Sequence, residues 1–252
     1  MCLIVFAVRP DDEHVLLLAG NRDEFHERPT EPLAWWKDRP DVVGGRDAQA
    51  GGTWLAASRR GRFATVTNSR DAEPPDPGLR SRGLLVTDFL DSELSPMAFL
   101  EAVDGAHYAG FNLVISDGRS VAYGGNRGAG PRELGPGVYA VSNAVLDTPW
   151  HKVEYAKSAF DALTREGLPN DESLLELLAN DQRAPIESVQ PGKLPIELAH
   201  AITAPFIVGS TYGTRSMSIV RLQSGGDISI VERRFGADGH PTGEDRVSYS
   251  SS

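Results

Sequence analysis

The chain opens with Met1-Cys-Leu-Ile-Val-Phe-Ala-Val8 and continues, after the loop Arg9-Pro-Asp-Asp-Glu13, with Val15-Leu-Leu-Leu-Ala19. β-Branched and aromatic residues favour strands, and a loop that contains Pro and Asp favours a reversal of the chain. Two such apolar runs on either side of a turn-forming loop predict a β-hairpin. The next residues, 21–24, are polar and would lie where the second strand ends.

The register of this hairpin decides which residues face Cys2. If Val8 pairs with residue 15 or 16, the same antiparallel register places Cys2 opposite Asn21 or Arg22. The hairpin is therefore expected to bring the segment 21–24 to the only cysteine of the chain.

Beyond the hairpin, short apolar segments bounded by Gly, Asp or Pro predict strands, and apolar residues at three- and four-residue spacing predict helices. The further strands are expected at 53–57, 62–68, 111–116, 120–123, 137–141, 216–222 and 227–233, and the helices at 82–89, 96–103, 148–163 and 171–178. Strands, then helices, then more strands are typical of a layered α+β fold rather than of repeated βαβ units. We expect a single domain over residues 1–240, and a polar, disordered tail at 241–252.

The composition excludes several classes of protein. The 35 acidic and 25 basic residues give a net charge of −10, which argues against a nucleic-acid partner. No apolar run approaches the ~20 residues of a membrane span, and the single cysteine excludes an internal disulfide. These features predict a cytoplasmic protein without a membrane span, and they leave its oligomeric state open.

Metal and cofactor motifs are missing from the sequence. The six histidines are scattered, and no pair of them has the spacing of zinc ligands. A phosphate-binding loop is absent, and in Gly209-Ser-Thr-Tyr-Gly213 the serine stands one position too early for a serine-hydrolase elbow. We therefore expect no metal, no cofactor and no serine triad.

Cys2 is a candidate for another kind of chemistry, because it follows the initiator methionine. Removal of Met1 would leave one residue with both a thiol and a free α-amine. Their ordinary pKa values, about 8.5 and about 7.7–8.0, make proton exchange between them nearly thermoneutral. Cys2 is therefore a candidate nucleophile, with its own α-amine as the base.

Polar residues flank otherwise apolar strands, and they could complete such a site. They are Arg22, Asp23, Asn68, Asn143 and Arg215. Asn side chains can donate hydrogen bonds to an oxyanion that develops on an attacked carbonyl, which suits Asn68 and Asn143. Arginine and aspartate could orient the α-amine and favour the thiolate, which suits Arg22, Asp23 and Arg215.

Six short motifs together resemble the NRDE-motif family, which is related to the transport-and-Golgi-organisation-two protein. They are Met1-Cys2, Gly20-Asn-Arg-Asp-Glu24, Gly51-Gly-Thr-Trp54, Thr67-Asn68, Ser142-Asn143 with Asp147-Thr-Pro-Trp150, and Tyr212-Gly-Thr-Arg215. The resemblance spans residues 1–234, and the linked motifs are more specific than any one of them.

That family is similar to N-terminal nucleophile hydrolases of the choloylglycine hydrolase and penicillin V acylase type. The resemblance implies a four-layer αββα sandwich with two central antiparallel sheets, and cleavage of amide bonds. It also implies that Cys2 is the nucleophile, that Asn68 and Asn143 are the oxyanion and amine-binding asparagines, and that Arg215 is a late active-site arginine.

The resemblance leaves two candidates for the acid of the site, Asp23 and Glu24. A strict alignment places Glu24 at the acidic position, but side chains alternate along a strand, so Arg22 and Glu24 share one face and Asp23 the other. All of them can contact Cys2 only if the strand ends or bulges there. We favour Arg22 and Asp23, with Glu24 as the alternative.

Two functions follow as hypotheses. The first is an amidase that cleaves a small acylated substrate through a thioester at Cys2. The second is a non-catalytic binding or trafficking protein for haem, a lipid or another apolar molecule on the same fold. In that case Trp35, Trp36 and Trp54 would be candidates to line a ligand groove.

Overall fold

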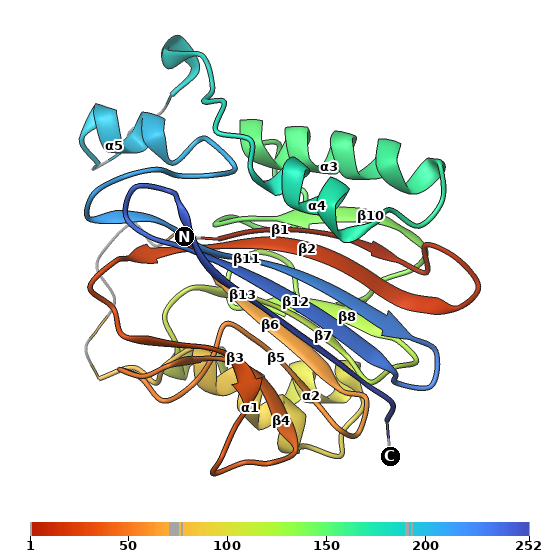
Figure 1. Ribbon diagram of the computed structural model, residues 1–252. Helices are drawn as coiled ribbons and strands as arrows, with labels where there is room; N and C mark the ends of the chain where they lie inside the picture. Colours follow the sequence, from red (N-terminus) through yellow and green to blue (C-terminus); the bar gives the residue numbers. More distant parts are fainter. Residues whose placement is uncertain (1, 71–75, 77, 190–191, 193, 252) are drawn as a thin grey trace.

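Two antiparallel sheets stack face to face, and helices cover their outer faces (Figure 1). The computed structural model describes residues 2–70, 76, 78–189, 192 and 194–251. The four layers are helices, sheet, sheet and helices, so the predicted αββα sandwich is confirmed. None of the helices in the described part of the chain has both the length and the apolar character needed to cross a bilayer.

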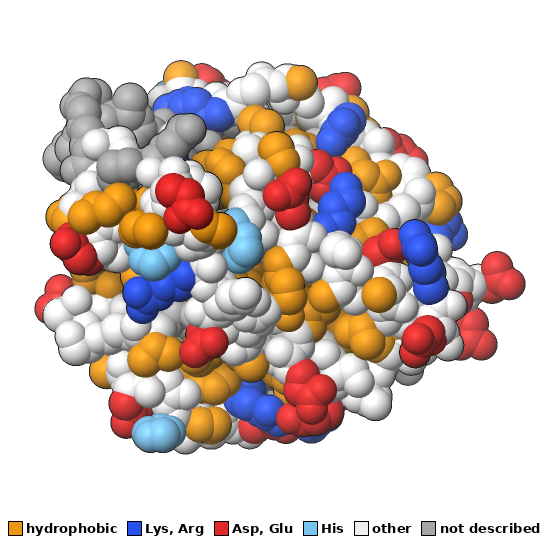
Figure 2. All heavy atoms as spheres, turned by 90° about the horizontal axis from the view of Figure 1, so that it is seen from above, with side chains coloured by type: hydrophobic (Ala, Val, Ile, Leu, Met, Phe, Trp, Pro, Cys, Tyr) orange, Lys and Arg blue, Asp and Glu red, His pale blue; other side chains and the backbone are white. Residues whose placement is uncertain are grey.

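The first sheet has the strand order β10-β1-β2-β11-β12-β13. Its strands are β1 (Cys2–Val8), β2 (His14–Phe25), β10 (Gly137–Val141), β11 (Tyr212–Gln223), β12 (Ile228–Phe235) and β13 (Pro241–Tyr249). Helices α3 (His151–Arg165) and α4 (Asp171–Leu178) cover its outer face, and the short helix α5 (Ile196–Ala201) lies beside them. Seen from above, this helical face mixes hydrophobic and charged side chains (Figure 2).

The second sheet follows the order of the sequence, from β3 to β9. Its strands are β3 (Thr30–Trp35), β4 (Val42–Asp47), β5 (Leu55–Ser58), β6 (Phe63–Asn68), β7 (Phe111–Ser116), β8 (Val121–Gly125) and β9 (Arg132–Glu133). Helices α1 (Gly83–Asp91) and α2 (Pro96–Ala102) pack on its outer face. Two 3-10 turns, Gly105–His107 and Ile186–Ser188, complete the described elements.

Side-chain alternation along the first hairpin explains the layers. Leu3, Val5 and Leu17 are fully buried under the helices of the first sheet. Ile4 and Phe6, one residue out of phase, lie between the two sheets. Because successive side chains of a strand point to opposite faces, a continuous apolar strand has to be covered on both sides.

The hairpin has one of the two predicted registers. Val8 pairs with Leu16, and Cys2 pairs with Arg22. On the other side of β2, the pairing with β11 shifts between Thr214 and Ser216, which is a β-bulge beside Asp23. The fold therefore ends the hairpin with Cys2 next to Arg22, and bends the neighbouring strand at that point.

Several elements had no prediction. Strands β3 and β4 were missed because β3 contains Pro32 and the centre of β4 is Gly44-Gly45, and these residues weaken a strand pattern. Of the three tryptophans expected to line a ligand groove, Trp54 lines a cavity beside Cys2. Trp36 is buried and donates its indole N–H to the Gly44 carbonyl at 3.0 Å, and Trp35 packs on Tyr249.

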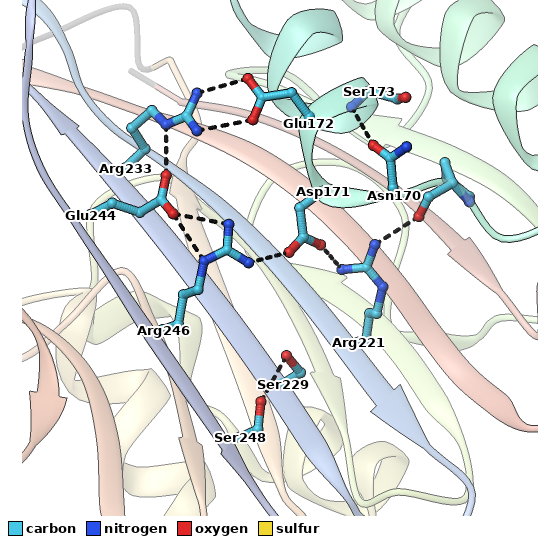
Figure 3. Close-up of polar contacts among 11 residues, drawn as sticks. Asn170, Asp171, Glu172, Ser173, Arg221, Ser229, Arg233, Glu244, Arg246 and Ser248 are labelled. Atoms are coloured by element: carbon cyan, nitrogen blue, oxygen red, sulfur yellow. Dashed lines mark hydrogen bonds and ion pairs between the residues drawn. The ribbon is translucent and has the colours of Figure 1, made fainter.

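The prediction of a disordered tail from residue 241 is wrong. Residues Pro241–Tyr249 form β13, which pairs with β12 along its length. A network of charged side chains links β11, β12 and β13 to the first turn of α4 (Figure 3). Its members are Asp171, Glu172, Arg221, Arg233, Glu244 and Arg246. The polar residues of this edge strand thus pair with residues of β12 and α4. The sequence pattern does not reveal these pairs.

We predict that a chain ending at His240 is less stable than the full chain by about 2–4 kcal/mol, because Val247 and Tyr249 pack on the core between the sheets. Tyr249 also donates a hydrogen bond to the Ser58 carbonyl at 2.9 Å. Urea unfolding followed by circular dichroism measures the difference. Removal of residues 251–252 alone is the control, and equal midpoints for all three chains would show that β13 adds no stability.

Candidate active site

A cavity of about 310 Å³ opens beside Cys2, at the end of the β1–β2 hairpin. Four of the six predicted site residues line it, together with Glu24. They are Cys2, Arg22, Asp23 and Asn68. The cavity walls come from both sheets and from the segment that precedes α1, so residues far apart in the sequence meet here.

The Cys2 thiol lies at the boundary between the buried core and the cavity, and its residue is half-buried. Burial raises the pKa of this thiol, and the negative charge of Asp23 adds to the effect. A backbone N–H of Asp23 and the positive charge of Arg22 act in the opposite direction. The balance favours the neutral thiol, so a nucleophilic reaction at Cys2 needs a group that accepts its proton.

Arg22 forms a fixed, positively charged wall of the cavity. It lies opposite Cys2 in the strand register and is buried. Its guanidinium stacks over the Trp54 ring, 4.2 Å from the ring centroid, and donates to the Thr30 hydroxyl at 3.2 Å. These contacts hold the charge at the thiol rather than in solvent.

Asp23 and Glu24 occupy different environments, although both line the cavity. Asp23 is buried, and its carboxylate accepts a hydrogen bond from the Thr214 hydroxyl at 2.8 Å. Glu24 is half-exposed, and its carboxylate accepts a hydrogen bond from the backbone N–H of Phe25 at 2.9 Å. The backbone and charge of Asp23 both act on the Cys2 thiol. This geometry supports Asp23 over Glu24 as the acid of the site.

The two asparagines are joined to each other and to the backbone of Cys2. Asn143 donates its side-chain N–H to the Asn68 carbonyl at 2.8 Å. The Ser142 hydroxyl donates to the Cys2 carbonyl at 2.7 Å and lies 3.0 Å from the Asn143 side-chain oxygen. Asn68 lines the Cys2 cavity, whereas Asn143 lines a second cavity beside it. The structure thus places Asn68 in the cavity of the thiol, and it links Asn143 to Asn68 and, through Ser142, to the Cys2 backbone.

Arg215 does not lie among the described residues that line the Cys2 cavity. Its guanidinium donates to the carbonyls of Phe25 and Arg28, at 2.7 and 3.2 Å. These bonds hold the turn after β2, and this turn carries Arg28 into the cavity wall. A catalytic role for Arg215 stays a prediction, and the observed contacts are those of a residue that shapes the loop.

Several neighbours of the site were not predicted as site residues. Trp54, Ser142 and Thr214 lie within the quoted motifs, so the motifs contained a signal for them. Lys152 had none, because a lysine at the start of a helix is normally solvated. It is buried here and lines the second cavity.

The second cavity has a volume of about 530 Å³, and polar and apolar side chains share its wall. Trp150, Val189, Ala199 and Ile202 belong to this wall. No group of three or more His, Cys, Asp or Glu side chains that could hold a metal ion occurs among the residues described.

We predict that alkylation of Cys2 has its pH midpoint above that of the same protein in denaturant, because burial raises the pKa of the thiol. Replacement of Arg22 by Met should move the midpoint further upward, since it removes a nearby positive charge. Intact-mass measurement of iodoacetamide labelling follows Cys2 alone, as it is the only cysteine. Replacement of the exposed Arg183 by Met is the control, and a midpoint in Arg22→Met at or below the native one would contradict the assigned effect.

Comparison with known proteins agrees with this architecture. The family model "Transport and Golgi organisation 2" matches residues 1–237. The chain is 35% identical to the Transport and Golgi organization protein 2 homologues of mouse and human, over 92% of this chain and 92% of each relative. A mutant conjugated bile acid hydrolase from Clostridium perfringens has the same fold, with a TM-score of 0.54 and 10% identity over 99% of this chain and 97% of that one. The chain belongs to the Transport and Golgi organisation 2 family, and it has the fold of the N-terminal nucleophile hydrolases.

Proposed function

We propose that this protein is an amidohydrolase that cleaves the C–N bond of a small acylated molecule through a thioester at Cys2. The observation that carries the proposal is the position of the thiol. Cys2 begins β1 in the wall of a cavity that Arg22, Asp23 and Asn68 also line, and it pairs with Arg22. The relationship in fold to a bile acid hydrolase supports the reaction class only as an analogy.

The reaction would begin after removal of Met1. The free α-amine of Cys2 takes the thiol proton, and the thiolate attacks the carbonyl carbon of the substrate. The carbonyl oxygen becomes an oxyanion, which the side-chain amide of Asn68 can stabilise as a hydrogen-bond donor. The α-ammonium then gives its proton to the leaving nitrogen, the C–N bond breaks, and a thioester remains on Cys2.

Water completes the cycle. The α-amine takes a proton from the water molecule, which attacks the thioester, and the thiolate leaves and is reprotonated. The products are a carboxylic acid and a free Cys2. Asp23 would orient the α-ammonium during both steps, because its buried carboxylate is one of the charges that act on Cys2.

The N-terminal form of the protein tests this mechanism. Protein that starts at Cys2 should hydrolyse at least one member of a panel of acyl amides, and mass spectrometry should find Met1 absent from native protein. One additional, non-removable residue before Cys2 keeps the thiol but removes the free amine. We expect it to lower kcat by a factor of about 100 or more, since it abolishes the general base.

The controls separate the thiol from the fold. Replacement of Cys2 by Ala should abolish turnover, and replacement of the exposed Glu13 by Ala, at the far end of the hairpin, should leave it unchanged. Retention of Met1 in the native protein would overturn the proposal. Equal turnover with and without the additional residue would overturn the role of the α-amine.

The second cavity supports a different candidate function, the binding of an apolar ligand. Its volume of about 530 Å³ exceeds that of the Cys2 cavity, and its wall includes Trp150 and Ile202. The names of the relatives refer to transport and Golgi organisation, which suits a carrier of haem, a lipid or another apolar molecule.

For this candidate we predict saturable haem binding that survives replacement of Cys2 by Ala and weakens when Ile202 is replaced by Asp. A carboxylate in place of the buried, apolar Ile202 side chain opposes the entry of an apolar ligand. A spectroscopic haem titration measures both effects. Non-saturable absorbance changes, or equal affinity in Ile202→Asp, would contradict haem binding in this cavity.

A further inference from the structure

Lys152 is buried in a place that is unfavourable for a lysine. Only 3% of its surface is exposed, and within the described structure its ammonium has no hydrogen-bond partner. It is the second residue of α3, where the positive end of the helix dipole opposes a further positive charge. Burial lowers the pKa of Lys152, so its ammonium form depends on anionic groups nearby.

The compensating charges belong to the Cys2 site. Asp23, also almost fully buried, is the first of the anionic groups that favour the charged form of Lys152, and Cys2 follows. In return, Lys152 is the foremost group that opposes the rise in the pKa of Asp23, a rise that burial causes. The charges thus support each other.

The geometry separates this pair from the other cation of the site. Asp23 alternates with Arg22 along β2, so the two side chains leave opposite faces of the strand. Arg22 pairs with Cys2 and is held by Trp54, between the sheets. Asp23 lies on the face that carries α3, from which Lys152 comes.

We propose that Lys152 is a positioning residue of the Cys2 site, whose ammonium keeps Asp23 ionised so that its carboxylate can hold the α-ammonium of Cys2. The charge of Asp23 is the direct claim. Its catalytic consequence rests on the proposed hydrolase function.

Other titratable groups lie close enough to influence these side chains or line the same cavity as Lys152. They are Cys2 on β1, Arg22 on β2, Tyr212 on β11, Arg70 after β6, and His151 and Glu154 on α3 itself. Arg70 opposes the charge of Lys152. The hydroxyl of Tyr212 donates to the Asp23 backbone carbonyl at 3.1 Å, so it does not neutralise the carboxylate.

A titration of Asp23 in the full, processed chain tests the proposal directly. Aspartate labelled with carbon-13 at the carboxyl group reports ionisation by NMR, and Asp23→Asn identifies the signal. In the native protein we expect the ionised form at pH 7. In Lys152→Met the titration should move up by about one pH unit or more, because a nearby opposite charge is lost. Lys152→Arg should restore it.

The control is Lys157→Met, which removes a partly exposed lysine from the same helix. It should leave the Asp23 titration unchanged. The proposal is overturned if Asp23 is protonated at pH 7 in the native protein, or if Lys152→Met titrates like Lys157→Met. Should Lys152→Met fail to fold, the native titration and Lys152→Arg still decide the question.

Turnover provides the second readout. If the protein hydrolyses an acyl amide, the acid limb of its pH profile for kcat/KM should move upward in Lys152→Met by the same amount as the Asp23 titration. If no amide is hydrolysed, the hydrolase proposal fails, and the NMR titration still tests the link between Lys152 and Asp23.

Discussion

The antiparallel pairing of β1 with β2 is the constraint on which the rest of the site depends. One hydrogen-bonded register places Cys2 opposite Arg22. It also buries both faces of the hairpin, one against the helices and the other against the second sheet. A shift of one residue would exchange these faces. The apolar residues of the hairpin therefore fix the register, and this register sets the positions of Cys2, Arg22 and Asp23.

Charged side chains have different environments in two parts of the first sheet. Along β11, β12 and β13, arginines and carboxylates pair at the protein surface, where water and salt weaken each interaction (Figure 3). Asp23 on β2 and Lys152 on α3 are buried, so the ionisation of each depends on the few groups around it. Such buried, mutually dependent charges are a common feature of functional sites.

The sequence predicted much of the fold and part of the site. The hairpin, its register to within one residue, and most of the central strands followed from periodicity, because their apolar residues are local in sequence. Strands β3 and β4 were missed because Pro32 and Gly44-Gly45 weaken their pattern, and β13 was missed because its residues are polar and its side-chain partners, such as Trp35 for Tyr249, are distant in sequence. Arg215 was expected in the cavity, but the structure uses it to hold the turn after β2.

The sequence alone predicted that a hairpin returns the chain to Cys2, and that Arg22 or its neighbour would lie opposite this residue. These are consequences of short-range pattern and strand geometry. Only the tertiary structure decided that Asp23 is buried while Glu24 is not, that Asn143 supports Asn68, and that Lys152 is buried in the wall of the second cavity. The reason is physical: burial and electrostatic environment are set by α3 and β11, which the fold packs against β1 and β2 from more than a hundred residues away in the sequence.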